Sequence, residues 1–328
     1  MLLLNREDIE RCIEFPTIVR ALEDALRGFM WSAPVVPQRL IIEHEPKKSF
    51  SLFMPAFLPT TQTLGVKVSS FHPGNSARGL AAVNGAVLLI DVDTGRLLAM
   101  LDSGALTAIR TSAMSALATD ILCPRRSINL AVIGAGAQAA AHIRAMATVR
   151  ELKQVRIFSR RLASSIALAE CLRAELNLPI EAVCEIEQAL ENADVVCTTT
   201  SHDSSQPLIS AHQLGPGVHI NAIGGSTVQA CEIDPCLLKT ARVYVDNLAA
   251  ACRESGEISQ ALASSAIDRK DVLELGSLLL GRSSPEASDS RSYFRSVGHA
   301  SQDMVVAACL YAVAKTGRIG KNCDYFCT

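Results

Sequence analysis

The sequence lacks a long apolar run, an excess of charge of either sign, and a paired-cysteine motif. No apolar stretch approaches the roughly 18 residues that a membrane-spanning helix needs, so we expect no membrane span. Basic and acidic side chains nearly balance, with a net charge of −2. This balance removes the electrostatic case for nucleic acid or an anionic membrane as a partner. The short apolar start, residues 1–4, is followed at once by polar residues, which argues against a signal peptide.

The cysteines and histidines show no pattern of metal or disulfide chemistry. Eleven cysteines are present, an odd number, and none forms a Cys-x-x-Cys pair. We therefore interpret them as core residues or surface thiols of a protein in a reducing compartment, and expect a cytoplasmic location. The histidines have no metal-ligand spacing with cysteine or acidic residues, so no metal site is predicted.

The chain length and the hydrophobic patterns predict two domains. With 328 residues, 49% hydrophobic and 20% charged, the composition is that of an ordinary globular protein. Helical spacing predicts one amphipathic helix over residues 5–30. Alternating or β-branched runs then predict antiparallel strands, followed by a helix over 103–122. The predicted strands cover residues 39–42, 50–54, 65–71, 86–92 and 96–101.

From residue 128 onward, apolar strands alternate with helices. Strands are expected at residues 128–133, 155–158, 194–199, 218–223 and 242–246, and a last apolar helix at 301–316. Such alternation is typical of a parallel sheet with helices on both faces. The predicted fold class is therefore α/β, a Rossmann-type doubly wound parallel sheet accompanied by an α+β domain.

A glycine turn within the first βαβ unit predicts a dinucleotide site. Gly134 and Gly136 follow the strand at 128–133 and open an alanine-rich helix. In this fingerprint the first glycine permits a tight turn, and the second lets the backbone approach a pyrophosphate. The helix directs unpaired N–H groups and its positive dipole end toward the phosphates. Ala139 is small enough for the close packing that a third glycine often provides.

The end of the second strand indicates which dinucleotide binds. NAD sites usually carry an acidic residue at this position, whereas this chain has Ser159 followed by Arg160 and Arg161. Two guanidinium groups could bind a 2′-phosphate, which favours NADPH, with NADH as the alternative. The competing interpretation is that both arginines simply begin a solvated helix.

Three cationic residues of the first domain form a second candidate site. Arg39, Lys67 and Arg110 each have apolar or small neighbours in the sequence. Lys67 alternates with two valines and so points to the opposite face of its strand. Considered singly, each fits a surface cation better than a ligand. If they converge, they would form an anion site suited to a carboxylate.

Several motifs together resemble the ornithine cyclodeaminase/mu-crystallin family over nearly the whole chain. That resemblance implies a homodimer whose first domains pair through their sheets, and a C-terminal helix that returns to the first domain. It divides the chain into a substrate-binding and dimerisation domain, residues 1–122 with 300–328, and an NADP-binding domain, residues 123–299. The matching motifs are Met54-Pro55-Ala56, Gly65-Val66-Lys67, Asp93-Thr94-Gly95, Leu106–Thr111, Gly134–Gln138, His219–Gly224 and Ser296–Asp303.

The resemblance also implies roles for individual residues. Arg39, Lys67 and Arg110 correspond to residues that hold a substrate α-carboxylate. The last three of the expected cofactor contacts fall near the nicotinamide half of the site. The full set is Gly134, Gly136, Ala137, Gln138, Ser159, Arg160, Arg161, Thr200, Gly224 and Ser296. Two departures distinguish this chain from cyclodeaminases, which carry an aspartate where it has Ser226 and a glutamate where it has Leu52. A serine cannot accept a proton or pair with the ornithine ammonium group as a carboxylate does.

These departures favour reduction of an imine over cyclisation of ornithine. The predicted activity is NADPH-dependent reduction of a cyclic imino acid, Δ1-pyrroline-2-carboxylate or Δ1-piperideine-2-carboxylate, to L-proline or L-pipecolate. Lys67 and Ser226 are the candidate catalytic residues, Lys67 as a proton donor and Ser226 as a relay. His299 is an alternative donor, although a core or capping role fits it better. The alternatives on the same scaffold are ornithine cyclodeaminase, alanine dehydrogenase and opine-type synthase. The non-enzymatic alternative is a mu-crystallin-like protein that binds the cofactor.

Overall fold

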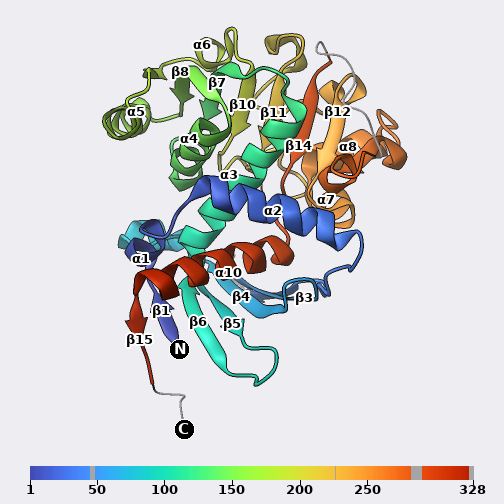
Figure 1. The fold of residues 1–328 in the computed structure, drawn as a ribbon. Coiled ribbons are helices and arrows are strands. Elements are labelled where there is room, and N and C mark those ends of the chain that lie inside the picture. The colour runs from blue at the N-terminus through green and yellow to red at the C-terminus, as the bar shows by residue number, and fades with distance from the viewer. Residues whose placement is uncertain (45–48, 226, 282–289, 325–328) are drawn as a thin grey trace. The chain divides into compact units, whose positions relative to one another are not determined.

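The computed structural model describes residues 1–44, 49–225, 227–281 and 290–324, and the chain forms two compact units (Figure 1). The first unit comprises Met1–Arg110 and His299–Thr328, and the second comprises Thr111–Gly298. The chain passes from the first to the second inside helix α3 (Ser103–Leu122), whereas the sequence placed the boundary at the end of that helix.

The first unit contains a seven-stranded sheet. Its order is β15-β1-β6-β5-β4-β3-β2, antiparallel except where β1 pairs with β6. The five strands predicted from alternation are present, and two short strands at its edge were missed. Strands of three and two residues, as these are, are too short for alternation to be recognised. The strands are β1 (Leu2–Leu4), β2 (Leu40–His44), β3 (Ser49–Leu58), β4 (Thr63–Phe71), β5 (Val83–Ile90), β6 (Leu97–Asp102) and β15 (Lys321–Asn322).

The predicted helix over residues 5–30 is wrong in one respect, because it is two helices. α1 spans Arg6–Glu10 and α2 spans Phe15–Phe29. Asn5 and Asp8 form a capping box that begins α1. Pro16 has no N–H and would clash with a preceding helical turn, so the chain breaks and α2 restarts with Pro16 in its first turn.

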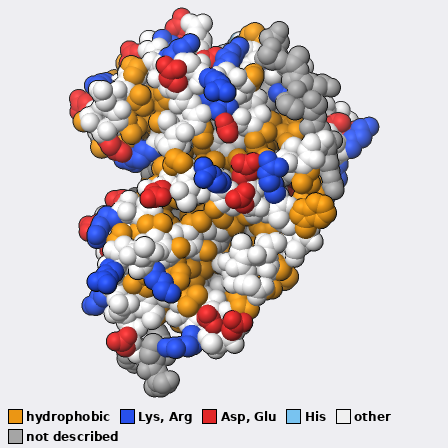
Figure 2. All heavy atoms as spheres, in the orientation of Figure 1, with side chains coloured by type: hydrophobic (Ala, Val, Ile, Leu, Met, Phe, Trp, Pro, Cys, Tyr) orange, Lys and Arg blue, Asp and Glu red, His pale blue; other side chains and the backbone are white. Residues whose placement is uncertain are grey.

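Helix α10 (Ala300–Gly317) determines which face of the first sheet is buried. It packs on β3, β4 and β5 and beside α2 (Figure 1). Lys67 stands opposite Met54 and Val87 in the strand register, and all three are buried. Lys67 therefore belongs to the buried face of the sheet. Figure 2 views the unit from the side of these helices, where hydrophobic and charged side chains are mixed.

The second unit contains an eight-stranded parallel sheet of order β13-β12-β14-β11-β10-β7-β8-β9. The strand order reverses between β7 and β10, the switch point at which doubly wound folds bind their ligands. This confirms the predicted Rossmann-type fold class. The strands are β7 (Ser127–Ile133), β8 (Glu151–Phe158), β9 (Ile180–Val183), β10 (Val195–Thr198), β11 (His219–Ala222), β12 (Arg242–Val245), β13 (Val272–Glu274) and β14 (Ser292–Arg295).

Both faces of this sheet are covered by helices. Strand β7 shows the division, since Leu130 and Val132 join one hydrophobic cluster and Ala131 and Ile133 join the other. Helices α4 and α5 contribute to the first cluster, and α6, α7 and α8 to the second. The helices are α4 (Ala137–Val149), α5 (Leu162–Leu176), α6 (Ile186–Leu190), α7 (Leu248–Glu254), α8 (Gly256–Ala263) and α9 (Leu275–Leu278).

Candidate functional site

The glycine turn after β7 has the geometry that the fingerprint requires. Gly134 has a φ of +120°. A Cβ placed there would lie 2.6 Å from Thr199 Oγ1 and 2.7 Å from the Thr199 carbonyl oxygen, so only glycine fits. Its N–H donates to the carbonyl oxygen of Phe158 at 2.7 Å, which ties the turn to the end of β8. The turn therefore lies at the reversal of strand order.

The start of α4 is open to a phosphate group. Gly136 is the N-cap residue, and Ala137 and Gln138 occupy the first turn. Gly136 and Ala137 are exposed, and a Cβ on Gly136 would meet no atom within 4 Å. Ala139, by contrast, is fully buried in the cluster beneath the helix. The exposed helix start, with its unpaired N–H groups, fits a dinucleotide pyrophosphate.

The segment after β8 presents two exposed guanidinium groups. Ser159 Oγ donates to the carbonyl oxygen of Arg161 at 2.9 Å and lies 2.8 Å from Ser165 Oγ. The serine thus stabilises the turn that leads into α5. Arg160 and Arg161 are both exposed just before that helix. This placement is compatible with a 2′-phosphate and equally with a solvated helix start.

Three other predicted cofactor residues lie at the carboxyl edge of the same sheet. Thr200, Gly224 and Ser296 follow β10, β11 and β14 respectively. Each contacts a charged side chain to which the sequence analysis gave no role. Ser226, the predicted relay, lies outside the described residues. The contacts are Thr200 with Glu232, Gly224 with Arg295, and Ser296 with Asp246.

Lys67, Arg110 and Asp303 form a buried ionic cluster within the first unit. Their side chains are 5%, 9% and 0% exposed. Lys67 Nζ lies 2.9 Å from each carboxylate oxygen of Asp303. Arg110 Nε lies 3.2 Å from Asp303 Oδ1, and Arg110 Nη1 donates to Gln302 Oε1 at 3.4 Å. Lys67 and Arg110 are therefore not surface cations, although the sequence around each one, considered singly, favoured that interpretation.

Arg39 completes the set of three cations. It is half-buried, and its charge is close enough to lower the pKa of Lys67. Burial is the largest cause of that shift, followed by the opposing attraction of Asp303, and the pKa of Lys67 falls to about 8. Three cations around one internal carboxylate leave the cluster with a net positive charge. Such a cluster would bind an added carboxylate and could also donate a proton near neutral pH.

Asp303 is the residue of this cluster that sequence reasoning missed. It was quoted only as part of the Ser296–Asp303 motif, without a role. In the structure it lies in the first turn of α10, where a helix dipole favours a carboxylate. The available signal was an isolated acidic residue in an apolar helix, because Lys, Glu, Arg and Asp are almost never fully buried unless paired.

The described residues contain neither a metal-binding cluster nor a membrane-spanning helix. No three histidine, cysteine, aspartate or glutamate side chains gather there as a metal ion would require. No helix in the described part of the chain has the length and apolar character to cross a membrane.

Comparison with known proteins places this architecture in context. A model of the ornithine cyclodeaminase/mu-crystallin family matches residues 1–318. The chain is 32% identical to the ketimine reductase mu-crystallin of Rattus norvegicus over 306 residues, 92% of this chain and 93% of the relative. The Thermococcus litoralis Δ(1)-pyrroline-2-carboxylate reductase, solved with NADH and L-proline, has a TM-score of 0.92 at 31% identity, covering 98% and 100% of the two chains. An archaeal alanine dehydrogenase dimer with bound NAD has a TM-score of 0.90 at 29% identity, covering 99% of each.

Proposed function

The chain belongs to the ornithine cyclodeaminase/mu-crystallin family, and on that premise we propose that it is a nicotinamide-dependent reductase of cyclic imino acids. The proposed substrate is Δ1-pyrroline-2-carboxylate, its six-membered homologue Δ1-piperideine-2-carboxylate, or both. The products are L-proline and L-pipecolate. The single observation that carries the proposal is the buried cluster of Lys67, Arg110 and Asp303.

Together with Arg39, the cluster would supply the two functions that an imino acid reductase needs from its own side chains, namely carboxylate binding and proton donation. Arg39 and Arg110 would hold the substrate carboxylate, since guanidinium groups pair with carboxylates through two parallel hydrogen bonds. Lys67 would protonate the ring nitrogen, because its pKa of about 8 leaves it charged at pH 7 yet able to release a proton. Asp303 would hold Lys67 in place as its counter-ion. When bound, a reduced nicotinamide supplies the hydride that adds to the imine carbon.

Two side chains support reduction over cyclodeamination. Leu52 stands on β3 where cyclodeaminases carry a glutamate, and Ser226 replaces their aspartate. Neither can accept a proton as a carboxylate does, so the chain lacks the acids that serve the δ-amine of ornithine. Alanine dehydrogenase activity, opine-type condensation and binding without turnover are the competing outcomes of the test below.

The proposal is tested by following cofactor absorbance. Purified protein is mixed with NADPH or NADH and Δ1-pyrroline-2-carboxylate or Δ1-piperideine-2-carboxylate, and we expect cofactor oxidation with formation of proline or pipecolate. Parallel reactions contain NAD⁺ with ornithine or alanine, and NADPH with pyruvate plus an amino acid. Ammonia release from ornithine without imine reduction would contradict the proposal. Tight cofactor binding with no turnover would favour a binding protein.

We propose NADPH as the preferred cofactor, on the strength of Ser159, Arg160 and Arg161 at the end of β8. Replacing both arginines with alanine is expected to raise the Kd for NADPH about tenfold or more, since a hydrogen bond to a charged group typically contributes that much. The Kd for NADH should change by less than about twofold, because NADH has no 2′-phosphate for these side chains to contact. Cofactor Kd values from nucleotide fluorescence measure both effects. Equal losses for the two cofactors would show that the arginines do not contact the phosphate.

We propose a homodimer paired through the outer face of the first sheet. Val66, Leu88 and Met100 share one row of the strand register, on the side opposite Lys67 and α10. Met100 is 38% exposed, so Met100→Lys should shift the protein toward monomers in sedimentation velocity experiments. Ile166→Lys, at a side chain 41% exposed in the second unit, is the matched control. A wild-type protein that sediments as a monomer would refute the dimer.

A further inference from the structure

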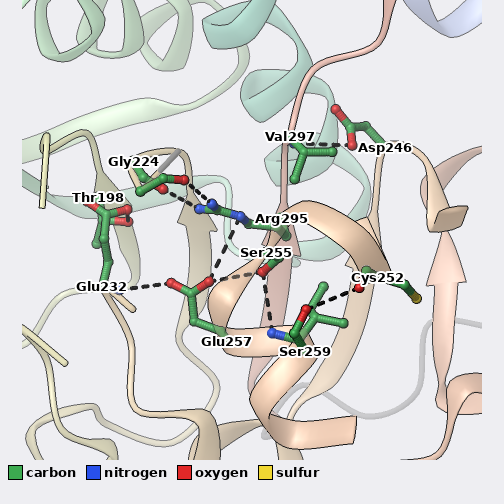
Figure 3. A network of polar contacts seen from close by, with 12 residues as sticks. Thr198, Gly224, Glu232, Asp246, Cys252, Ser255, Glu257, Ser259, Arg295 and Val297 are labelled. Carbon is green, nitrogen blue, oxygen red and sulfur yellow. Dashed lines mark hydrogen bonds and ion pairs between the residues drawn. The ribbon is translucent and has the colours of Figure 1, made fainter. Parts of the chain in front are cut away.

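A network of buried charges links the loops at the carboxyl edge of the parallel sheet (Figure 3). Arg295, at the end of β14, donates from Nη1 to the carbonyl oxygen of Gly224 at 2.5 Å. It also donates from Nη2 to the carbonyl oxygen of Gly225 at 2.5 Å. Its Nε lies 4.0 Å from Glu257 Oε2. One guanidinium group thus holds two successive carbonyl groups of the turn after β11.

Glu257 and Glu232 continue the network to the neighbouring strand. Glu257 Oε1 accepts from the backbone N–H of Glu232 at 2.8 Å. The Glu232 carboxylate accepts from Thr198 Oγ1 at 2.6 Å, and from the N–H and hydroxyl of Thr200 at 3.0 and 2.6 Å. The segment after β10 is therefore linked, through two carboxylates and one guanidinium, to the turn after β11.

The contact between these two loops leaves no spare volume. A Cβ on Gly224 would lie 2.2 Å from Glu232 Oε1 and 2.3 Å from the Thr200 carbonyl oxygen. The backbone of one predicted cofactor residue, Gly224, is therefore in direct contact with the side chain that fixes another, Thr200. A shift of Glu232 or Arg295 would move both residues.

Stability alone does not explain why this cluster is ionic. Arg295 is 1% exposed, and Glu232 and Glu257 are fully buried. Burial also raises the pKa of Glu232, which shows the cost of keeping that carboxylate charged. Buried ion pairs are often no more stabilising than well-packed apolar residues of similar volume. What the ions supply here is directional hydrogen bonding to backbone at two loop positions.

We infer that Arg295, Glu257 and Glu232 are positioning residues that preorganise Thr200 and Gly224 for the nicotinamide half of the cofactor. This inference rests on the proposed cofactor site. None of the bonds described above joins the charged side chains of the network to Gly134–Gln138 or Ser159–Arg161. Thr199, between Thr198 and Thr200, lies against Gly134, but the Glu232 carboxylate holds Thr198 and Thr200. The adenosine and phosphate half of the nucleotide should therefore depend on the network much less than the nicotinamide half does.

The test compares each whole cofactor with the same nucleotide lacking nicotinamide. Kd values are measured for NADPH and 2′-phospho-ADP-ribose, and for NADH and ADP-ribose, with wild type and Arg295→Lys. Lysine keeps the positive charge but lacks the rigid fork that reaches both carbonyl groups. We expect NADPH and NADH to bind about tenfold more weakly, with less than about a twofold change for the two truncated nucleotides. Arg269→Lys, at an exposed position of the same unit, is the control.

The outcomes separate the inference from the proposed function. Equal weakening of whole and truncated nucleotides, or no weakening of either, would overturn the positioning role while leaving the cofactor site intact. A wild-type protein that binds none of the four nucleotides would overturn the proposed function itself. If Arg295→Lys does not fold, Thr198→Val decides the question. That variant removes the hydroxyl donor to Glu232 and keeps the Thr198 carbonyl oxygen that accepts from the Gly224 N–H, and the same selective weakening of cofactor binding, smaller in size, is expected.

Discussion

Replacing Lys67 with methionine is expected to lower kcat for imine reduction by about 10²- to 10⁴-fold, the contribution typical of a positioned general acid. Methionine preserves the length and apolar stem of the side chain but has no proton to donate. Steady-state cofactor oxidation measures the effect. Lys321→Met, at an exposed lysine of the same unit, is the matched control and should retain wild-type kcat.

The lowered pKa of Lys67 also predicts the direction in which kcat/KM changes with pH. Because the pKa of Lys67 is lowered to about 8, the lysine is protonated at pH 7 and loses its proton as the pH rises past 8. For imine reduction, kcat/KM should therefore fall above about pH 8, and for oxidation of proline it should rise over the same range. The Lys67→Met variant should lack this fall in kcat/KM above about pH 8, the alkaline limb of the pH profile. A variant that kept both wild-type kcat and the wild-type pH profile would exclude Lys67 as the proton donor.

Replacing Asp303 with asparagine is expected to move that alkaline limb to lower pH. The Asp303 carboxylate raises the pKa of Lys67 through its charge and its hydrogen bond, and Arg110 and Arg39 act in the opposite direction. Without the carboxylate, the pKa of Lys67 falls further below its usual range. Less of the lysine is then protonated at pH 7, and reduction slows.

The same substitution should also destabilise the protein. Removing one partner of a buried ion pair leaves an uncompensated charge, which typically costs about 3–5 kcal/mol in the free energy of unfolding. Chemical denaturation of Asp303→Asn measures this change, with the exposed Asp24→Asn as the control. If the pH profile of the folded variant matches that of wild type, Asp303 is not the counter-ion that sets the protonation of Lys67.

The glycine turn of the candidate cofactor site could be predicted from the sequence because its signals are local. Gly134 and the strand before it are adjacent in the chain, and the turn that they form requires glycine at that one position. The hydrophobic patterns likewise predicted five strands of each sheet. They missed β1 and β15, which have too few residues to show a period, and also the short strands β9, β13 and β14 of the parallel sheet. They also missed the break caused by Pro16, which separates α1 from α2.

The ionic cluster could not be located from local signals. Lys67 and Asp303 are 236 residues apart in sequence, and only the return of α10 to the first sheet brings them together. Pattern alone could place Lys67 on one face of β4 but not show that α10 buries that face. Arg295 and Glu232 presented the same difficulty, because their partners lie on distant segments of the chain. Arg295 contacts Gly224 after β11 and Glu257 on α8, and Glu232 accepts from Thr198 on β10.

The most direct test of imine reduction by this protein is to follow the hydride itself. Δ1-pyrroline-2-carboxylate is incubated with the protein and NADPH carrying deuterium at nicotinamide C4, on each face in turn, and the proline is analysed by mass spectrometry and NMR. Imine reduction predicts L-proline with one deuterium at C2 from one of the two labelled faces, and no release of ammonia. Unlabelled proline from both cofactors, or no proline while ornithine is consumed, would contradict it.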